Sequence, residues 1–170
     1  MGELDLLKPT IERSLGGTIH FGRVAMKPGK PTTFATIPYQ PTSGDRNAAS
    51  DKLVFSLPGN PASALVTANL FVLPALQKLS GKPEPWGLPR MKVVLGERMK
   101  CDKERAEYHR VRLEAGNDGR VIAYSTGGQR SSRVGSLREA QGLLCLPARD
   151  GTIGKGELLD ALLMGGLNGL

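Results

Sequence analysis

Apolar and polar positions along the first half of the chain predict alternating helix and strands. Residues 3–15 repeat apolar side chains with a weak helical period, and the pair Gly16-Gly17 ends that pattern. Residues 18–26, 32–37 and 52–57 are predicted as strands from their apolar, largely alternating pattern. This mixture of helical and strand segments is typical of the α/β class.

The longest apolar segment, residues 61–80, is predicted as a helix that is apolar on nearly every side, and such a helix is expected to be buried on more than one side. Pro74 lies inside it and should kink it, because proline lacks the backbone donor of a helical residue. Gly81 is a natural stop signal. Residues 38–51 are rich in Pro, Ser, Gly, Asn and Asp and are predicted as a surface loop.

The second half of the chain changes character after a proline-rich stretch at residues 82–89, which we interpret as a linker. Short strands separated by turn signals follow, with one short helix at 132–140, and this spacing favours a small β-rich barrel or sandwich. The strands are expected at residues 91–95, 108–114, 121–125, 142–146 and 157–163. The prediction is therefore an α/β part at 1–84 and a β-rich, barrel-like part at 85–170.

Composition narrows the class of protein. The hydrophobic fraction of 39% suits a soluble globular core. A formal net charge of +7 and a pI near 9.7 favour an anionic partner, although a solvated basic surface explains them equally well. No Lys/Arg-rich tail is present, so we expect no nucleic-acid binding. We also expect no membrane insertion, since no apolar run is long enough and no signal-peptide pattern opens the chain.

The cysteines and histidines suggest no site by their spacing. Cys101 and Cys145 are far apart and have neither metal-ligand spacing nor the pattern of a disulfide framework, so a reduced, cytoplasmic protein is the simplest interpretation. His20 and His109 have no third ligand at zinc spacing.

The most informative segment, KLVFSLPGNPAS, joins a strand to the long helix through a tight turn. Gly59 and Asn60 readily take positive φ, Asn60 can cap the helix, and Pro61 suits the first helical position. The N–H groups of residues 62–64 would then point outward without partners, beside the hydroxyl of Ser63. This arrangement predicts an anion pocket, and the alternative is a capped core helix that binds nothing.

A second rigid turn, KPGKP, lies upstream and carries Lys27 and Lys30. One turn would offer N–H donors and the other ammonium groups, so together they suggest a site for phosphate or another oxyanion. The alternative is a pair of solvated surface lysines.

Several segments carry a family likeness, in this order: MGELD, FGRVAMKPGKPTTFA, FSLPGNPASALVTANLFVLPAL, EYHRVRL and STGGQRSSRVGSLREAQGLLCLP. Through them nearly the whole chain resembles the C-terminal half of the gephyrin E-domain family, the molybdopterin molybdenumtransferases. EYHR and the SSR segment indicate the eukaryotic gephyrin-like branch.

The resemblance implies an enzyme of molybdenum cofactor biosynthesis. Members insert molybdate into adenylated molybdopterin and release AMP, assisted by Mg²⁺. They form homodimers in the cytoplasm. The chain would supply part of the α/β molybdopterin-binding subdomain and the β-rich C-terminal subdomain, as a fragment of the enzyme.

The resemblance also assigns roles to residues. Asp5, with Glu3 as a weaker candidate, would handle metal or phosphate, and Lys27 and Lys30 would neutralise the anion. An ordinary helix-start acid is the alternative for Asp5. The expected cofactor-binding residues are Pro58, Gly59, Asn60, Pro61, Ser63, Ser131, Ser132 and Arg133.

Gephyrin itself also clusters receptors by binding their cytoplasmic loops, so a scaffold is the second hypothesis. Tyr108 and Pro147 match positions of that groove, although a strand aromatic and a turn proline explain them as well. A folded fragment without activity of its own is the third.

Overall fold

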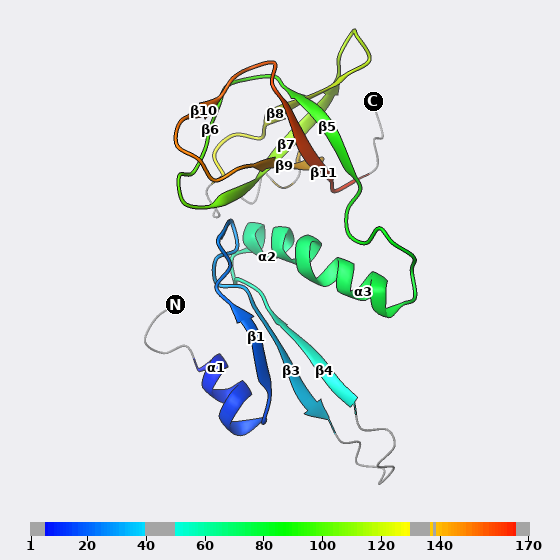
Figure 1. Cartoon of the computed structure of the whole chain (residues 1–170). Helices are drawn as coiled ribbons and strands as arrows, with labels where there is room; N and C mark the ends of the chain where they lie inside the picture. The colour runs from blue at the N-terminus through cyan, green and yellow to red at the C-terminus, as the bar shows by residue number, and fades with distance from the viewer. Residues whose placement is uncertain (1–5, 40–49, 130–136, 138, 166–170) are drawn as a thin grey trace.

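The structure, a computed structural model, describes residues 6–39, 50–129, 137 and 139–165. Figure 1 shows two parts, a three-stranded sheet with helices and a barrel, and the long helix lies between the sheet and the barrel. The prediction of an α/β part followed by a β-rich part is confirmed.

The first part begins with a helical turn, α1 (Leu7–Pro9), which continues into a π-helical turn, η1 (Thr10–Ser14). Three antiparallel strands follow in the spatial order β1 (Thr18–Gly22), β3 (Thr33–Tyr39) and β4 (Ser50–Ser56). The strands extend into both ends of the predicted loop 38–51, and residues 40–49 lie outside the described part.

The strand predicted at 18–26 is two strands in different sheets. Arg23, with φ of 70°, ends β1 and turns the chain, and its N–H donates to the carbonyl of Thr32. The chain then forms β2 (Met26–Lys27), which pairs in parallel with β7 of the barrel. A period-2 pattern cannot reveal this change of sheet, because both strands alternate in the same way.

The long helix consists of α2 (Pro61–Thr67), a π-helical turn η3 (Ala68–Val72) and α3 (Leu73–Leu79). Pro74 follows the π turn, and the wider geometry of that turn accommodates the proline ring and its lack of an N–H donor. At the end, the N–H of Gly81 (φ 77°) donates to Lys78 and the N–H of Lys82 donates to Gln77, each at 3.0 Å. This is a Schellman motif, so the predicted stop at Gly81 is confirmed.

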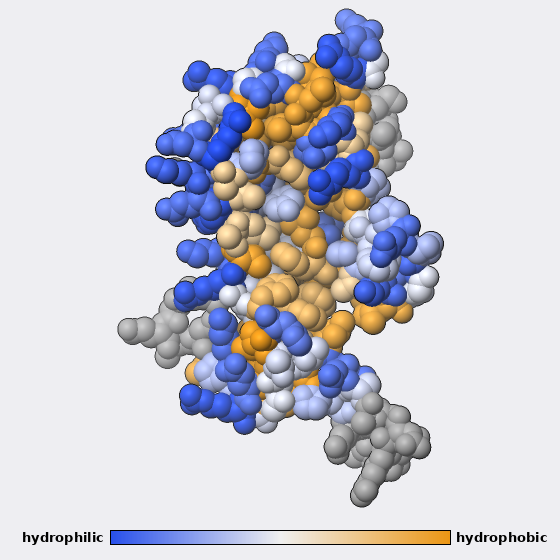
Figure 2. All heavy atoms as spheres, viewed as in Figure 1, coloured by the Kyte–Doolittle hydropathy of each residue, from blue (hydrophilic) through white to orange (hydrophobic). Residues whose placement is uncertain are grey.

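The expectation that this helix is buried on several sides is wrong for the described structure. Its buried residues are confined to α2, on the face toward the barrel and the KPGKP turn, while Leu76 is 58% and Leu79 68% exposed. Figure 2 shows hydrophobic residues at the surface at the level of this helix. By length and composition alone the helix could also cross a membrane, contrary to the sequence-based expectation, although a core helix meets the same criterion.

The second part is a closed barrel of five strands, in the order β7, β8, β5, β11 and β9, which the pairing of β7 with β9 closes. All five predicted strands are present; the two-residue strands β6 and β10, which pair with each other, were not predicted. The strands are β5 (Arg90–Leu95), β6 (Met99–Lys100), β7 (Ala106–Ala115), β8 (Val121–Ser125), β9 (Gly142–Leu146), β10 (Thr152–Ile153) and β11 (Leu158–Leu163). The helix predicted at 132–140 falls almost wholly outside the described residues.

Two hydrophobic clusters hold the structure together. One fills the barrel with side chains such as Val93, Val111 and Leu144, all fully buried. The other joins the two parts, since Val66 of α2 packs with Leu143 and other residues of the barrel. The connection between α3 and β5 contains the predicted boundary between 84 and 85, which stays a prediction.

Candidate functional site

The LPGNP turn is built around the side chain of Asn60. Asn60 has extended backbone angles (φ −74°, ψ 126°), and its Oδ1 accepts from the N–H groups of Ala62 at 3.1 Å and Ser63 at 3.3 Å. Pro61 occupies the first helical turn. The predicted cap is therefore confirmed, but the expected positive φ at Gly59 and Asn60 is not observed.

The same cap overturns the expectation of free N–H groups at the helix start. The donors of Ala62 and Ser63 are bonded to the Asn60 amide oxygen, and the N–H of Ala64 donates to the Asn60 carbonyl at 2.8 Å. An anion could reach these donors only by displacing the Asn60 side chain. Ser63 is also buried, at 6% exposure.

The KPGKP turn packs directly on helix α2. Gly29 has φ of 115°, and a Cβ placed there would lie 2.5 Å from Cγ2 of Thr67, a fully buried residue of α2. The hydroxyl of Thr32 donates to the Gly29 carbonyl at 2.7 Å and holds the turn closed. The turn that carries the lysines therefore lies against the helix that follows LPGNP.

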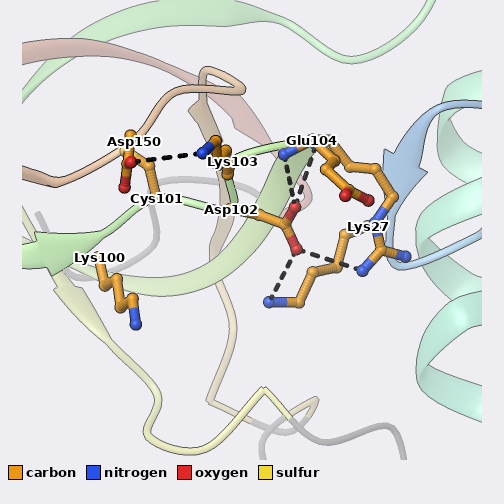
Figure 3. Close-up of a pocket in the computed structure, with 8 residues that line it drawn as sticks. Lys27, Lys100, Cys101, Asp102, Lys103, Glu104 and Asp150 are labelled. Atoms are coloured by element: carbon orange, nitrogen blue, oxygen red, sulfur yellow. Dashed lines mark hydrogen bonds and ion pairs between the residues drawn. The ribbon is translucent and has the colours of Figure 1, made fainter.

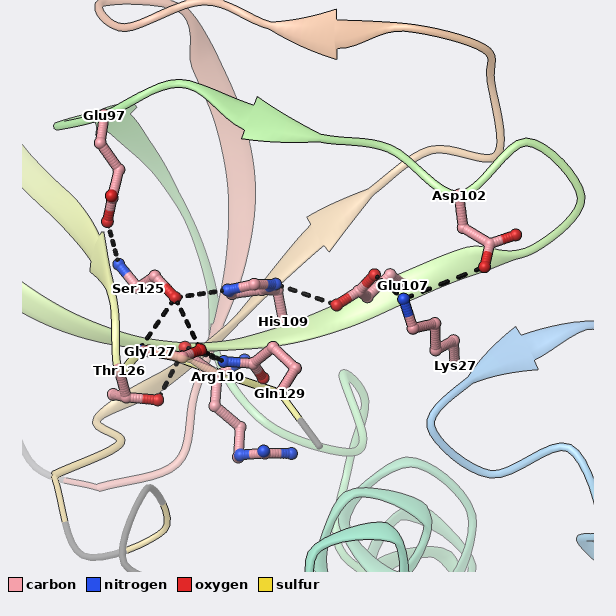
Figure 4. Close-up of polar contacts among 10 residues, drawn as sticks. All are labelled: Lys27, Glu97, Asp102, Glu107, His109, Arg110, Ser125, Thr126, Gly127 and Gln129. Atoms are coloured by element: carbon pink, nitrogen blue, oxygen red, sulfur yellow. Dashed lines mark hydrogen bonds and ion pairs between the residues drawn. The ribbon is translucent and has the colours of Figure 1, made fainter. Parts of the chain in front are cut away.

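The two lysines of this turn have different surroundings. Nζ of Lys27 lies 3.0 Å from Oε2 of Glu107 and 3.9 Å from Oδ2 of Asp102, and 42% of its side chain is exposed (Figure 4). Lys30 is exposed and makes no ion pair with any residue that the structure describes. Lys27 is thus an ammonium group already held by two carboxylates, and Lys30 is a solvated one.

Asp102 belongs to a turn of the barrel that faces Lys27 (Figure 3). Its carboxylate accepts from the N–H groups of Glu104 and Arg105 and from the Arg105 guanidinium, and these contacts lower its pKa. A cleft of about 610 Å³ opens here. It is lined by Lys27, Lys100, Cys101, Asp102, Lys103, Glu104, Arg105 and Asp150.

A hydrogen-bonded chain leads from Lys27 into the barrel (Figure 4). Oε1 of Glu107 lies 2.9 Å from Nδ1 of His109, and Nε2 of His109 lies 2.7 Å from Oγ of Ser125. Glu107 is 5% exposed. Burial raises its pKa, but the hydrogen bonds and charges of His109 and Lys27 outweigh that effect and leave the pKa below its ordinary value.

Beyond Ser125 the chain reaches the loop that follows β8. The N–H of Ser125 donates to Oε1 of Glu97 at 2.7 Å, and the N–H of Gly127 donates to Ser125 Oγ at 3.1 Å. Nearby, Gln129 Oε1 accepts from the backbone N–H of Arg110 at 2.9 Å. The network therefore extends from Lys27 through β7 to the loop that follows β8.

Arg110 is the largest fully buried side chain of the described structure. Burial lowers the pKa of its guanidinium, and the charge of Glu107 opposes that effect. Sequence reasoning passed over Asp102, Glu107 and Arg110. Strand periodicity could have shown that 107 and 109 share one face of β7, but not that Lys27 lies opposite Glu107.

Five of the predicted site residues lie outside the described part of the chain: Glu3, Asp5, Ser131, Ser132 and Arg133. Within the described part, no group of three or more His, Cys, Asp or Glu side chains could hold a metal ion. The roles predicted for these five residues stay predictions.

The two residues of the alternative hypothesis lie near each other. Tyr108 of β7 is the register partner of Cys145 in β9, and Pro147 follows β9 in an exposed position. Tyr108 is half-buried against the cluster that joins the two parts, and burial raises the pKa of its hydroxyl. A larger cleft of about 1010 Å³ opens between α3, the linker and Leu162.

Comparison with known proteins matches both parts of the chain. The model described as "Probable molybdopterin binding domain" covers residues 1–78, and the one described as "MoeA C-terminal region (domain IV)" covers residues 92–164. Gephyrin of Dictyostelium discoideum is 46% identical over 99% of this chain and 24% of its own length. A molybdopterin molybdenumtransferase of Nostoc is 34% identical over 89% of this chain and 32% of its own length.

A solved structure gives the same picture. A molybdopterin biosynthesis MoeA protein of Pyrococcus horikoshii superposes with a TM-score of 0.69 and 28% identity, over 95% of this chain and 35% of that one. The chain therefore spans about a quarter to a third of the length of these relatives.

Proposed function

Since the chain belongs to the family of gephyrin and the molybdopterin molybdenumtransferases, we propose that the whole protein inserts molybdate into adenylated molybdopterin and releases AMP, in molybdenum cofactor biosynthesis. Relatives that match nearly the full length of this chain are named molybdopterin molybdenumtransferase. This chain contributes part of the molybdopterin-binding region and the barrel, and the proposed activity is that of the whole protein.

One observation carries the proposal: the KPGKP turn packs on the helix that begins at LPGNP. This contact joins Gly29 to Thr67, the last residue of α2, so the turn that carries Lys27 and Lys30 lies against the helix that LPGNP begins. Molybdate and the cofactor phosphate are tetrahedral anions that ammonium groups bind well. Because Asn60 occupies the helix N–H groups, the lysines rather than the free helix end supply most of the attraction.

Three further features are proposed for the whole protein. Mg²⁺ would assist the reaction at Asp5 and Glu3, because carboxylate oxygens are ligands that this ion prefers. The protein would act as a cytoplasmic homodimer.

A receptor scaffold is the second candidate, because Tyr108 lies in the β7–β9 ladder and Pro147 directly follows β9. Titration with a receptor-loop peptide tests it. Saturable binding that Tyr108→Ala removes would support the scaffold, and no binding by the intact protein would reject it.

The enzyme proposal is tested by measuring AMP release by the whole protein with adenylated molybdopterin and molybdate. We expect release that depends on molybdate and that Lys27→Glu abolishes. Lys52→Glu is the matched control, because Lys52 is an exposed lysine of β4 that lies over the Tyr39 ring, away from the turn. Equal activity of the Lys27→Glu protein and the wild type would reject the proposal.

A further inference from the structure

We infer that Glu107 is a positioning residue for the anion site, and that it acts by holding the ammonium group of Lys27. The inference rests on the proposed function. It starts from a register pair: β2 is only two residues long, and Lys27 lies directly opposite Glu107 in its parallel pairing with β7. The lysine of one part of the molecule is therefore fixed by a carboxylate of the other.

Glu107 is itself rigidly held. Both of its oxygens are engaged, Oε2 by Lys27 at 3.0 Å and Oε1 by His109 at 2.9 Å, and the residue is almost completely buried. A buried carboxylate with both oxygens bound has little rotational freedom, so its partner ammonium is held in one place.

His109 extends this support into the barrel. The low pKa of Glu107 keeps its carboxylate ionised, so it only accepts, and Nδ1 of His109 donates to it. Nε2 of His109 lies 2.7 Å from the hydroxyl oxygen of Ser125, within hydrogen-bond distance. The orientation of Glu107 therefore also depends on β8, a barrel strand that does not pair with β2.

This support leaves Lys27 able to bind an anion. An ammonium group has three donors. Glu107 takes one at hydrogen-bond distance, Asp102 is an ion-pair partner at 3.9 Å, and 42% of the side chain is exposed. Lys27 thus offers a pre-positioned donor, whereas the exposed Lys30 must be ordered when the anion binds.

The test is a double-mutant cycle on molybdate-dependent AMP release by the whole protein. We expect Glu107→Ala to raise the KM for molybdate about tenfold, the factor that corresponds to losing one charge-assisted hydrogen bond, with kcat nearly unchanged. In a Lys27→Ala background the same change should have no further effect on KM. Glu114→Ala is the matched control, because Glu114 is a partly exposed acid of the same strand, with 43% of its side chain accessible, that pairs with Arg112.

A general loss of structure is separated from loss of positioning by Glu107→Gln, which keeps the side-chain volume. We expect this variant to raise KM in the wild-type background and not in the Lys27→Ala background. An effect of Glu107→Ala on KM that persists in full without Lys27 would overturn the inference, as would a fall in kcat at constant KM.

The failure of the proposed function would look different. If the wild-type protein released no AMP in response to molybdate, both proposals would fall. If Lys27→Ala raised KM while Glu107→Ala and Glu107→Gln did not, only the positioning role would fall.

Discussion

Replacing Gly29 by alanine tests the contact between the two turns, from which the candidate site is built. The new Cβ would lie 2.5 Å from Cγ2 of Thr67 and 3.3 Å from Cε of Met26, in a backbone conformation (φ 115°) that side chains rarely adopt. Overpacking a tight site costs about 1–3 kcal/mol, and the unfavourable φ costs about 1–3 kcal/mol more. We therefore expect Gly29→Ala to lower the free energy of unfolding by about 2–6 kcal/mol.

Urea denaturation followed by circular dichroism measures this change. Gly81→Ala is the control, because Gly81 also has positive φ (77°) but no atom lies within 4 Å of its Cβ position. It should cost only about 1–2 kcal/mol, the backbone share. The double variant Gly29→Ala with Thr67→Ser should recover part of the loss, since it removes the clashing methyl and keeps the hydroxyl that donates to the Ser63 carbonyl at 2.9 Å. If Gly29→Ala cost no more than Gly81→Ala, the KPGKP turn would not pack on α2 as described.

Three further outcomes are expected. Asn60→Ala should lower the free energy of unfolding by about 1 kcal/mol in urea denaturation, because it removes the oxygen that caps α2, and no change would contradict the cap. Because the pKa of Glu107 is lowered in the folded protein, its carboxylate should stabilise the folded state above pH 4.5, its ordinary pKa, and this stability should be lost as the pH falls through the lower pKa of the folded state. Glu107→Gln should flatten that part of the plot of unfolding free energy against pH, and an unchanged slope would argue against the ion pair. Leu144→Ala in the barrel core should cost about 2–5 kcal/mol and Leu76→Ala, on the exposed side of α3, much less, so equal losses would contradict the assigned burial.

Much of the fold could be predicted from local signals. Alternating apolar positions flanked by turn residues predict the strand at 121–125 with its observed bounds. The Gly81 stop and the Asn60 cap were also predictable, since each depends on one residue type at one position.

The features that were missed depend on residues far apart in the chain. Nothing local shows that residues 26 and 27 leave the strand predicted there and pair with β7. The surroundings of Lys27 follow from that pairing, so the sequence indicated a cation without showing the carboxylate of Glu107 beside it. The prediction of free N–H groups at the helix start is wrong for a related reason: the side chain of Asn60, the residue that marks the turn, accepts hydrogen bonds from those groups.

Calorimetric titration of the protein with molybdopterin, alongside its mass in solution by light scattering, tests the proposed anion site most directly. We expect saturable binding by a dimer that Lys27→Glu abolishes and Lys52→Glu leaves intact. Binding that is equally tight in the Lys27→Glu protein, or no binding by the intact whole protein, would contradict the assignment of the site to the KPGKP turn.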